Sequence, residues 1–178
     1  MKVPVAKRHM LVLEGILMAV LFSILIAPLT LPTGSVGDLD GSIGSLDHGD
    51  DLNDLPWLQR AVYLLGDVNC HQQTERSFFL NDNQIPFCAR DLGLLAGATV
   101  GLALFILLGR RVPWAWLLAL LVPMAVDGVL QAITDYESSN ALRLLTGLFA
   151  GAAAGYGAGI LVSRFFDAPD EGKGEGQQ

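Results

Sequence analysis

Apolar residues gather in four long blocks that are separated by polar segments, and they do not alternate along the chain. A helix needs about 20 mainly apolar residues to cross a hydrocarbon core of about 30 Å. The blocks are close to this length, which predicts an all-α fold built as a four-span transmembrane helical bundle. The predicted spans cover residues 10–31, 92–109, 113–134 and 141–163.

The first block follows a basic segment, residues 1–9, which contains Lys2, Lys7 and Arg8. A basic start before an apolar run is also typical of a cleaved signal peptide. This run is longer than a usual signal-peptide core, and no clear small-x-small cleavage site follows it. We therefore expect an uncleaved first span.

Residues 32–91 form a long connection whose three parts are residues 33–54, 56–67 and 70–91. Residues 33–54 are rich in Gly, Ser and Asp, a composition that buries little apolar surface and predicts a mobile loop. Its carboxylates lack the spacing of a calcium-binding EF-hand, so a solvated acidic loop is the favoured interpretation. Residues 56–67 carry apolar side chains at helical spacing, which predicts a short amphipathic helix at the membrane surface.

The basic residues beside the spans predict the orientation. One set of loops and termini contains Lys2, Lys7, Arg8, Arg110, Arg111, Arg164 and Lys173, and the other contains Arg60, Arg76, Arg90 and Arg143. The richer set is expected inside, which predicts a multi-pass protein of the cell membrane with both termini cytoplasmic. Residues 32–91 would then be external, and residues 164–178 would form a disordered cytoplasmic tail.

Two spans carry glycine at every fourth position. The stripes consist of Gly93, Gly97 and Gly101 in one span and Gly147, Gly151, Gly155 and Gly159 in the other. Small residues at this spacing allow close backbone contact between membrane helices, either within the chain or in a homo-oligomer. Membrane lipid is the expected partner, and the net charge of −7 argues against nucleic acid.

The third span contains an aspartate well inside its apolar length. Pro123, Asp127 and Gln131 are four residues apart and share one helical face. A buried carboxylate there is costly unless it meets a partner or water. It could pair with Arg143 or Arg90 and lock the bundle. Alternatively, a polar pocket could be lined by Asp127, Gln131, Asn140 and Arg143, or Asp127 could serve a small carrier.

Residues 70–91 hold both cysteines of the chain. Cys70, His71, Cys88 and Asp91 supply two thiols, an imidazole and a carboxylate, which suit zinc or another divalent transition metal. A disulfide between Cys70 and Cys88 in an oxidising compartment is the alternative, and it would make the chain a structural or accessory protein. A cysteine nucleophile with His71 as base is a third possibility.

Two arginines lie in the same stretch. Arg76, next to Ser77, and Arg90, next to a predicted helix start, suit a phosphate or a lipid headgroup. Surface pairs with neighbouring carboxylates would explain the same arginines without a ligand. Asp91 cannot serve fully both as a metal ligand and as an arginine partner.

The pattern Cys70-His-Gln, Glu75-Arg-Ser-Phe and Cys88-Ala-Arg resembles the family named domain of unknown function 2085, which comprises small predicted membrane proteins. The resemblance extends over residues 57–159, and many relatives have Cys-x-x-Cys where this chain has Cys88-Ala-Arg-Asp91. It implies a membrane architecture and the position of a site. We therefore expect an integral membrane protein of unknown activity with a metal-binding or ligand-binding site at the outer membrane face.

Overall fold

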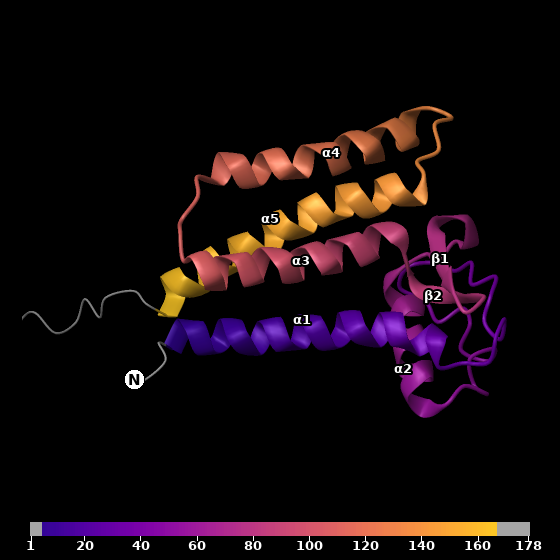
Figure 1. Cartoon of the computed structure of the whole chain (residues 1–178). Coiled ribbons are helices and arrows are strands. Elements are labelled where there is room, and N and C mark those ends of the chain that lie inside the picture. Colours follow the sequence, from indigo (N-terminus) through magenta and orange to yellow (C-terminus); the bar gives the residue numbers. More distant parts are fainter. Residues whose placement is uncertain (1–4, 167–178) are drawn as a thin grey trace, which may run out of the picture.

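The computed structural model describes residues 5–166. Four long helices run side by side along the molecule, as Figure 1 shows. They are α1 (Val5–Leu29), α3 (Ala89–Leu108), α4 (Trp114–Ile133) and α5 (Asn140–Phe166). All four are long and apolar enough to cross a membrane. Their exposed surface consists largely of apolar side chains, which fits lipid as the solvent and is consistent with a multi-pass membrane protein.

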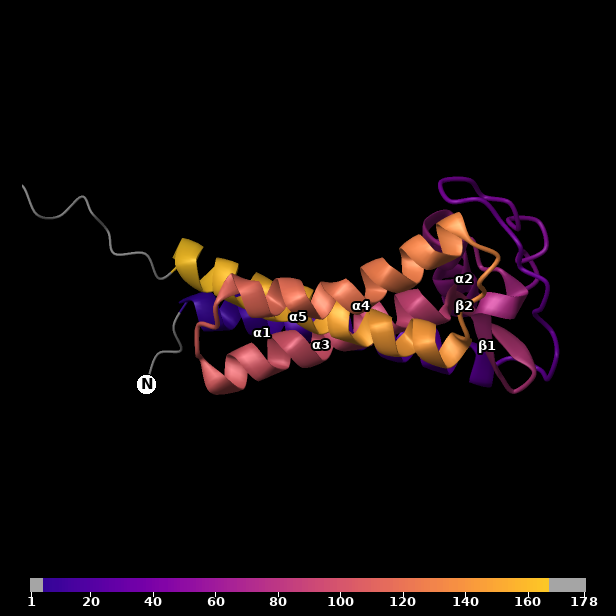
Figure 2. The ribbon, with the colours of Figure 1, turned by 90° about the horizontal axis from the view of Figure 1, so that it is seen from above.

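The smaller elements gather beyond one end of this bundle (Figures 1 and 2). They are α2 (Trp57–Asn69), the single 3₁₀ turn η1 (Thr74–Arg76), and the strands β1 (Ser77–Leu80) and β2 (Asn83–Cys88). The opposite end holds the start of α1 and the end of α5, where the rings of His9 and Phe166 stack with centroids 4.3 Å apart. In the described chain, the short elements therefore lie at one end of the bundle.

The hairpin of β1 and β2 corrects the prediction of an all-α fold. Its two-residue turn consists of Asn81 and Asp82, with φ of 54° and 56°. Two consecutive left-handed residues form the turn whose twist suits antiparallel strands, and Asn and Asp tolerate that conformation. Leu80 pairs with Asn83 across the turn, and Ser77 pairs with Cys88 at the far end. The hairpin thus places Cys88 beside the start of α3.

The acidic loop of residues 33–54 has no helix or strand, but it is packed, contrary to the expectation that it buries little apolar surface. Val36, Leu39 and Leu52 are buried in one cluster with residues of α1, α2 and β2. Side-chain amides of the hairpin hold its backbone: Asn83 Oδ1 accepts from the Val36 amide at 2.9 Å, and Gln84 Oε1 accepts from the Leu39 amide at 3.1 Å. These contacts depend on residues distant in sequence, so the loop's composition did not reveal them.

Helix ends differ from the predicted ones by a few residues. α1 begins at Val5 and not at residue 10, and α3 begins at Ala89 and not at residue 92. α3 ends at Leu108, where the following Gly109 adopts a left-handed conformation with φ of 60°, and α4 begins after Pro113. α5 continues to Phe166, through the first residues of the predicted tail, and the rest of that tail lies outside the described residues.

The glycine stripes meet each other, which confirms the predicted close helix packing. Most of the contact within the bundle is between α3 and α5, with α4 against α5 and α1 against α3. Gly97 of α3 faces the backbone of Leu148 and Ala152, and Gly151 of α5 faces the backbone of Leu94 and Ala98. The stripes therefore serve a contact within the chain, and a homodimer through the same glycines would require this contact to open.

Candidate functional site

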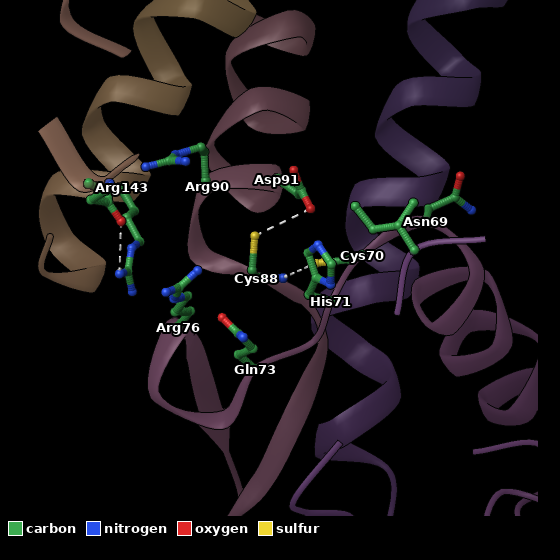
Figure 3. A pocket seen from close by; sticks show the side chains of 11 residues that line it. Asn69, Cys70, His71, Gln73, Arg76, Cys88, Arg90, Asp91 and Arg143 are labelled. Carbon is green, nitrogen blue, oxygen red and sulfur yellow. Dashed lines mark hydrogen bonds between the residues drawn. The ribbon is translucent and has the colours of Figure 1, made fainter. Parts of the chain in front are cut away.

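A cavity of about 230 Å³ lies at the polar end of the bundle, where the hairpin meets α3, α4 and α5 (Figure 3). Most of the side chains predicted from the sequence line it: Cys70, His71, Arg76, Cys88, Arg90, Asp91, Gln131 and Arg143. The other three predicted residues, Ser77, Asp127 and Asn140, connect to this wall from behind through hydrogen bonds. The cavity therefore joins the Cys/His stretch and the third span in one site.

Two thiols and one carboxylate form a cluster in the cavity wall. Cys70 follows the last turn of α2, Cys88 precedes the first turn of α3, and Asp91 lies within that turn. Their sulfur and oxygen atoms all lie within 4.8 Å of one another. The Cys88 Sγ is 3.3 Å from Asp91 Oδ2, and the Cys88 amide donates to the Cys70 Sγ at 3.3 Å. No disulfide joins the two cysteines in this structure.

Buried amide side chains hold the two cysteines beside each other. Gln72, which is fully buried and has a φ of 45°, donates from Nε2 to the Pro86 carbonyl at 2.7 Å. Gln84 in turn donates from its own Nε2 to the Gln72 carbonyl. These bonds fasten the segment after Cys70 to β2, the strand that ends at Cys88. The amides position the cluster without belonging to it.

The two thiols differ in acidity. The hydrogen bond between the Cys70 and Cys88 side chains raises the pKa of Cys70, and burial raises it further. The same bond lowers the pKa of Cys88, against burial and the nearby Asp91 carboxylate, which act in the opposite direction. The start of α3 also favours a negative charge on Cys88. Of the two thiols, Cys88 thus has the surroundings that favour the thiolate.

His71 is separate from this cluster. Its Nδ1 lies 3.1 Å from the Gly41 carbonyl oxygen, and its own carbonyl accepts a hydrogen bond from the Gly41 amide at 3.0 Å. Figure 3 shows the imidazole beside Cys70 at the rim of the cavity. The structure thus brings together three of the four predicted metal ligands, and it directs one nitrogen of the fourth toward the acidic loop.

Asp127 pairs with Arg90, one of the two arginines considered for it. Asp127 is one of only two buried residues of α4 in the described chain, and its Oδ2 lies 2.5 Å from the Arg90 guanidinium. Gln131 donates to the same oxygen at 2.9 Å. The pair therefore ties α4 to the first turn of α3, because a buried carboxylate in lipid needs such a partner.

The same network continues into α5 and the hairpin. Arg143 donates to Gln131 Oε1 at 3.2 Å and to Asn140 Oδ1 at 3.3 Å. Asn140 donates to the Ser77 carbonyl at 3.1 Å. These hydrogen bonds link α4, α5 and the hairpin, with Gln131 and Arg143 in the cavity wall and Asp127 and Asn140 behind it. The ion pair of Asp127 with Arg90 is present in the structure, and a ligand-binding pocket stays a prediction.

Several residues of the site could not be found from the sequence. Asn69, Gln73 and Ile43 also line the cavity, and Gln72 and Gln84 hold the cysteines in place. The only local signal was that Gln72 and Gln73 directly follow Cys70-His71. Their roles depend on contacts with the hairpin, which the chain composition does not specify.

The chain matches the sequence model of one protein family over residues 70–156, and that family is described as "Predicted membrane protein". An uncharacterised protein of Methanocaldococcus jannaschii is 35% identical over 108 residues, which is 58% of this chain and 69% of that protein. An uncharacterised protein of Methanothermobacter thermautotrophicus is 39% identical over 85 residues, which is 46% of this chain and 77% of that protein. No solved structure matches the chain.

The matched region begins at Cys70 and ends within α5, so it includes the whole thiol–carboxylate cluster and the arginines of the cavity. Its first residues are those whose pattern resembled the family in the sequence. The chain therefore belongs to the family of membrane proteins named domain of unknown function 2085.

Proposed function

We propose that this membrane protein binds one divalent transition metal ion, with zinc the best fit, through Cys70, Cys88 and Asp91. The observation that carries the proposal is the convergence of two thiols and a carboxylate within 4.8 Å of one another. Zinc binds such atoms at about 2.0–2.3 Å, so ligands on one ion lie roughly 3–4 Å apart. Small side-chain rotations would bring the three atoms to that separation.

The position of the cluster suggests an accessible site. The three residues form part of a cavity wall, and zinc sites with three protein ligands leave one position for water or another ligand. His71 stays the predicted fourth ligand, because its ring lies beside Cys70 at the same cavity. A site with His71 would be closed, and one without it would be open to a ligand.

We further propose that this cavity faces the outside of the cell and that both termini are cytoplasmic. Several basic residues support this orientation, because they lie at the opposite end of the bundle, around the start of α1, the turn from α3 to α4 and the end of α5. They are Lys7, Arg8, Arg110, Arg111 and Arg164. Basic residues beside spans favour the cytoplasmic side. A membrane-impermeant thiol reagent that labels Cys88 in intact cells would support it, and labelling only after lysis would contradict it.

Metal analysis of the purified protein tests the metal site. The protein is extracted in detergent without chelator, and its metals are measured together with its reactive thiols. We expect about one zinc per chain and thiols that react fully only after chelation. Asp91→Asn should lower zinc occupancy. Asp82→Asn is the matched control, because Asp82 lies at the exposed hairpin turn and should keep full occupancy.

A structural disulfide between Cys70 and Cys88 is the second candidate, and the closeness of the two sulfur atoms favours it. Such a bond would close a loop of about 19 residues and stabilise the fold by roughly 3 kcal/mol in the loop-entropy model. Protein without metal and without reactive thiols before reduction would establish the disulfide and exclude the metal site.

A further inference from the structure

Three guanidinium groups converge on the same cavity as the thiols. Arg76 comes from η1, Arg90 from the first turn of α3, and Arg143 from the first turn of α5. Figure 3 shows the arginines to one side of the cysteines and Asp91. The cavity thus has a thiol–carboxylate side and an arginine side.

The charge on the arginine side is only partly neutralised by the described residues. Arg90 has Asp127, whereas Arg76 has only Glu75 at 3.9 Å, and both of those side chains are substantially exposed. Arg143 is 4% exposed, and its hydrogen-bond partners are the neutral amides of Gln131 and Asn140. A buried guanidinium without a carboxylate is costly, and neighbouring positive charges increase that cost.

Some N–H donors of these arginines have no hydrogen-bond partner in the described structure. A guanidinium carries five N–H donors, and Arg143 makes one hydrogen bond to an amide from each of its two terminal nitrogens. The Nε atoms of Arg76 and Arg90 are buried and have no hydrogen-bond partner in the described structure. Arg76 Nε has Glu75 at 3.9 Å as its only ion-pair partner among the described residues, so a ligand with acceptor oxygens would give both donors a partner.

We propose that this side of the cavity binds a phosphate group, free or as part of a phosphate ester. The planar fork of arginine matches the spacing of phosphate oxygens, and the excess positive charge matches an anion. The cavity of about 230 Å³ is smaller than the roughly 300–1,000 Å³ of sites for drug-sized ligands, so it suits one small group. Because the cavity lies at the end of a membrane bundle, it is at the level of lipid headgroups and is also within reach of soluble phosphate.

This inference deepens the proposed function, because the arginines and the metal ligands share one cavity and a phosphate ester would be the substrate class of the site. It uses different side chains, however, and binding by the arginines does not require the metal. The two proposals can therefore fail separately.

The test measures phosphate binding by titration calorimetry. The full chain is placed in nanodiscs of phosphatidylcholine after treatment with chelator, and chloride at equal ionic strength serves as the blank. We expect saturable binding of inorganic phosphate at one site per chain. Arg76→Gln should weaken binding about tenfold or more, because one charged donor fork is lost. Arg76 is used because its side chain is partly exposed, so the variant should fold.

Two controls make the result specific. Arg110→Gln removes an exposed arginine at the opposite end of the bundle and should leave phosphate binding unchanged. Arg111→Gln removes a second exposed arginine at that end and should also leave it unchanged. Absence of phosphate binding, or equal weakening by Arg110→Gln or Arg111→Gln, would overturn the arginine site.

The source of the phosphate is tested with the lipid. If a headgroup occupies the site, a few per cent of phosphatidic acid in the nanodisc should compete with inorganic phosphate in the wild type and less so in Arg76→Gln. If the ligand is soluble, the lipid should leave the phosphate affinity unchanged while Arg76→Gln still weakens it. Either pattern supports a phosphate site.

Discussion

The contact between α3 and α5 is made by backbone against backbone, and adding a single methyl group to it should be costly. A Cβ on Gly151 would overlap the carbonyl of Leu94 and crowd the amide nitrogen of Ala98. Main-chain atoms cannot rotate away as a side chain can, so Gly151→Ala must push the two helices apart. By contrast, a Cβ on Gly15 of α1 would meet nothing within 4 Å.

The two substitutions allow the packing cost to be separated from helix propensity. Alanine is favoured over glycine inside a helix by about 1 kcal/mol, and this gain applies to both variants. Overpacking a close contact costs about 1–3 kcal/mol. Gly15→Ala should therefore be neutral or slightly stabilising, and Gly151→Ala should be less stable than Gly15→Ala by about 1–3 kcal/mol.

The free energy of unfolding can be measured by titration with sodium dodecyl sulfate in mixed micelles, with tryptophan fluorescence as the signal. Gly97→Ala makes the reciprocal change on α3 and should cost a similar amount, and the double variant should cost less than the sum because one separation relieves both overlaps. Equal stability of Gly151→Ala and Gly15→Ala would refute the close contact. A dimer interface would instead make the cost depend on protein concentration.

Three further predictions concern the polar end of the molecule. Asp127→Asn should lower the free energy of unfolding by about 3 kcal/mol. This is the low end of the range for breaking a buried ion pair, because the Arg90 side chain is partly exposed. An unchanged detergent titration would exclude the ion pair. Asn83→Ala leaves two carbonyl groups and one amide without their partner, so it should cost about 2 kcal/mol and speed proteolysis of residues 33–54; equal cleavage rates would contradict it. His48→Ala removes the imidazole nitrogen that lies 2.9 Å from the fully buried Asp67 carboxylate. We expect the free energy of unfolding to fall by about 1–3 kcal/mol in the same titration, and wild-type stability would contradict this.

The resemblance to a family was readable from the chain, because it depends on residue types at set spacings. Cys70-His71, Glu75-Arg76 and Cys88-Ala-Arg identified it, and the family comparison confirmed it over residues 70–156. The glycine stripes were equally readable, because a period of four residues is a property of one helix. Which helices the stripes join required the structure.

The hairpin and the packed loop could not be predicted from the sequence, for a physical reason. The turn at Asn81 and Asp82 is short, and its strands are too short to show a clear alternation. The loop of residues 33–54 is held by Asn83 and Gln84, which are more than 40 residues away from the groups that they bind. Composition reports what a segment can bury on its own, and it cannot report what another segment covers.

The sequence alone determined that the chain has four segments able to cross a membrane and where its chemical groups are concentrated. The length of each apolar segment identifies the spans, because in lipid a helix can hydrogen-bond all of its own backbone N–H and C=O groups. The residue types in each segment show where the chemical groups are concentrated. Only the tertiary structure decided that Asp127 meets Arg90, that His71 Nδ1 lies at the Gly41 carbonyl, and that Cys70, Cys88 and Asp91 form a cluster. These facts depend on which helix turns and strand ends meet, and that is set by packing between segments far apart in the chain.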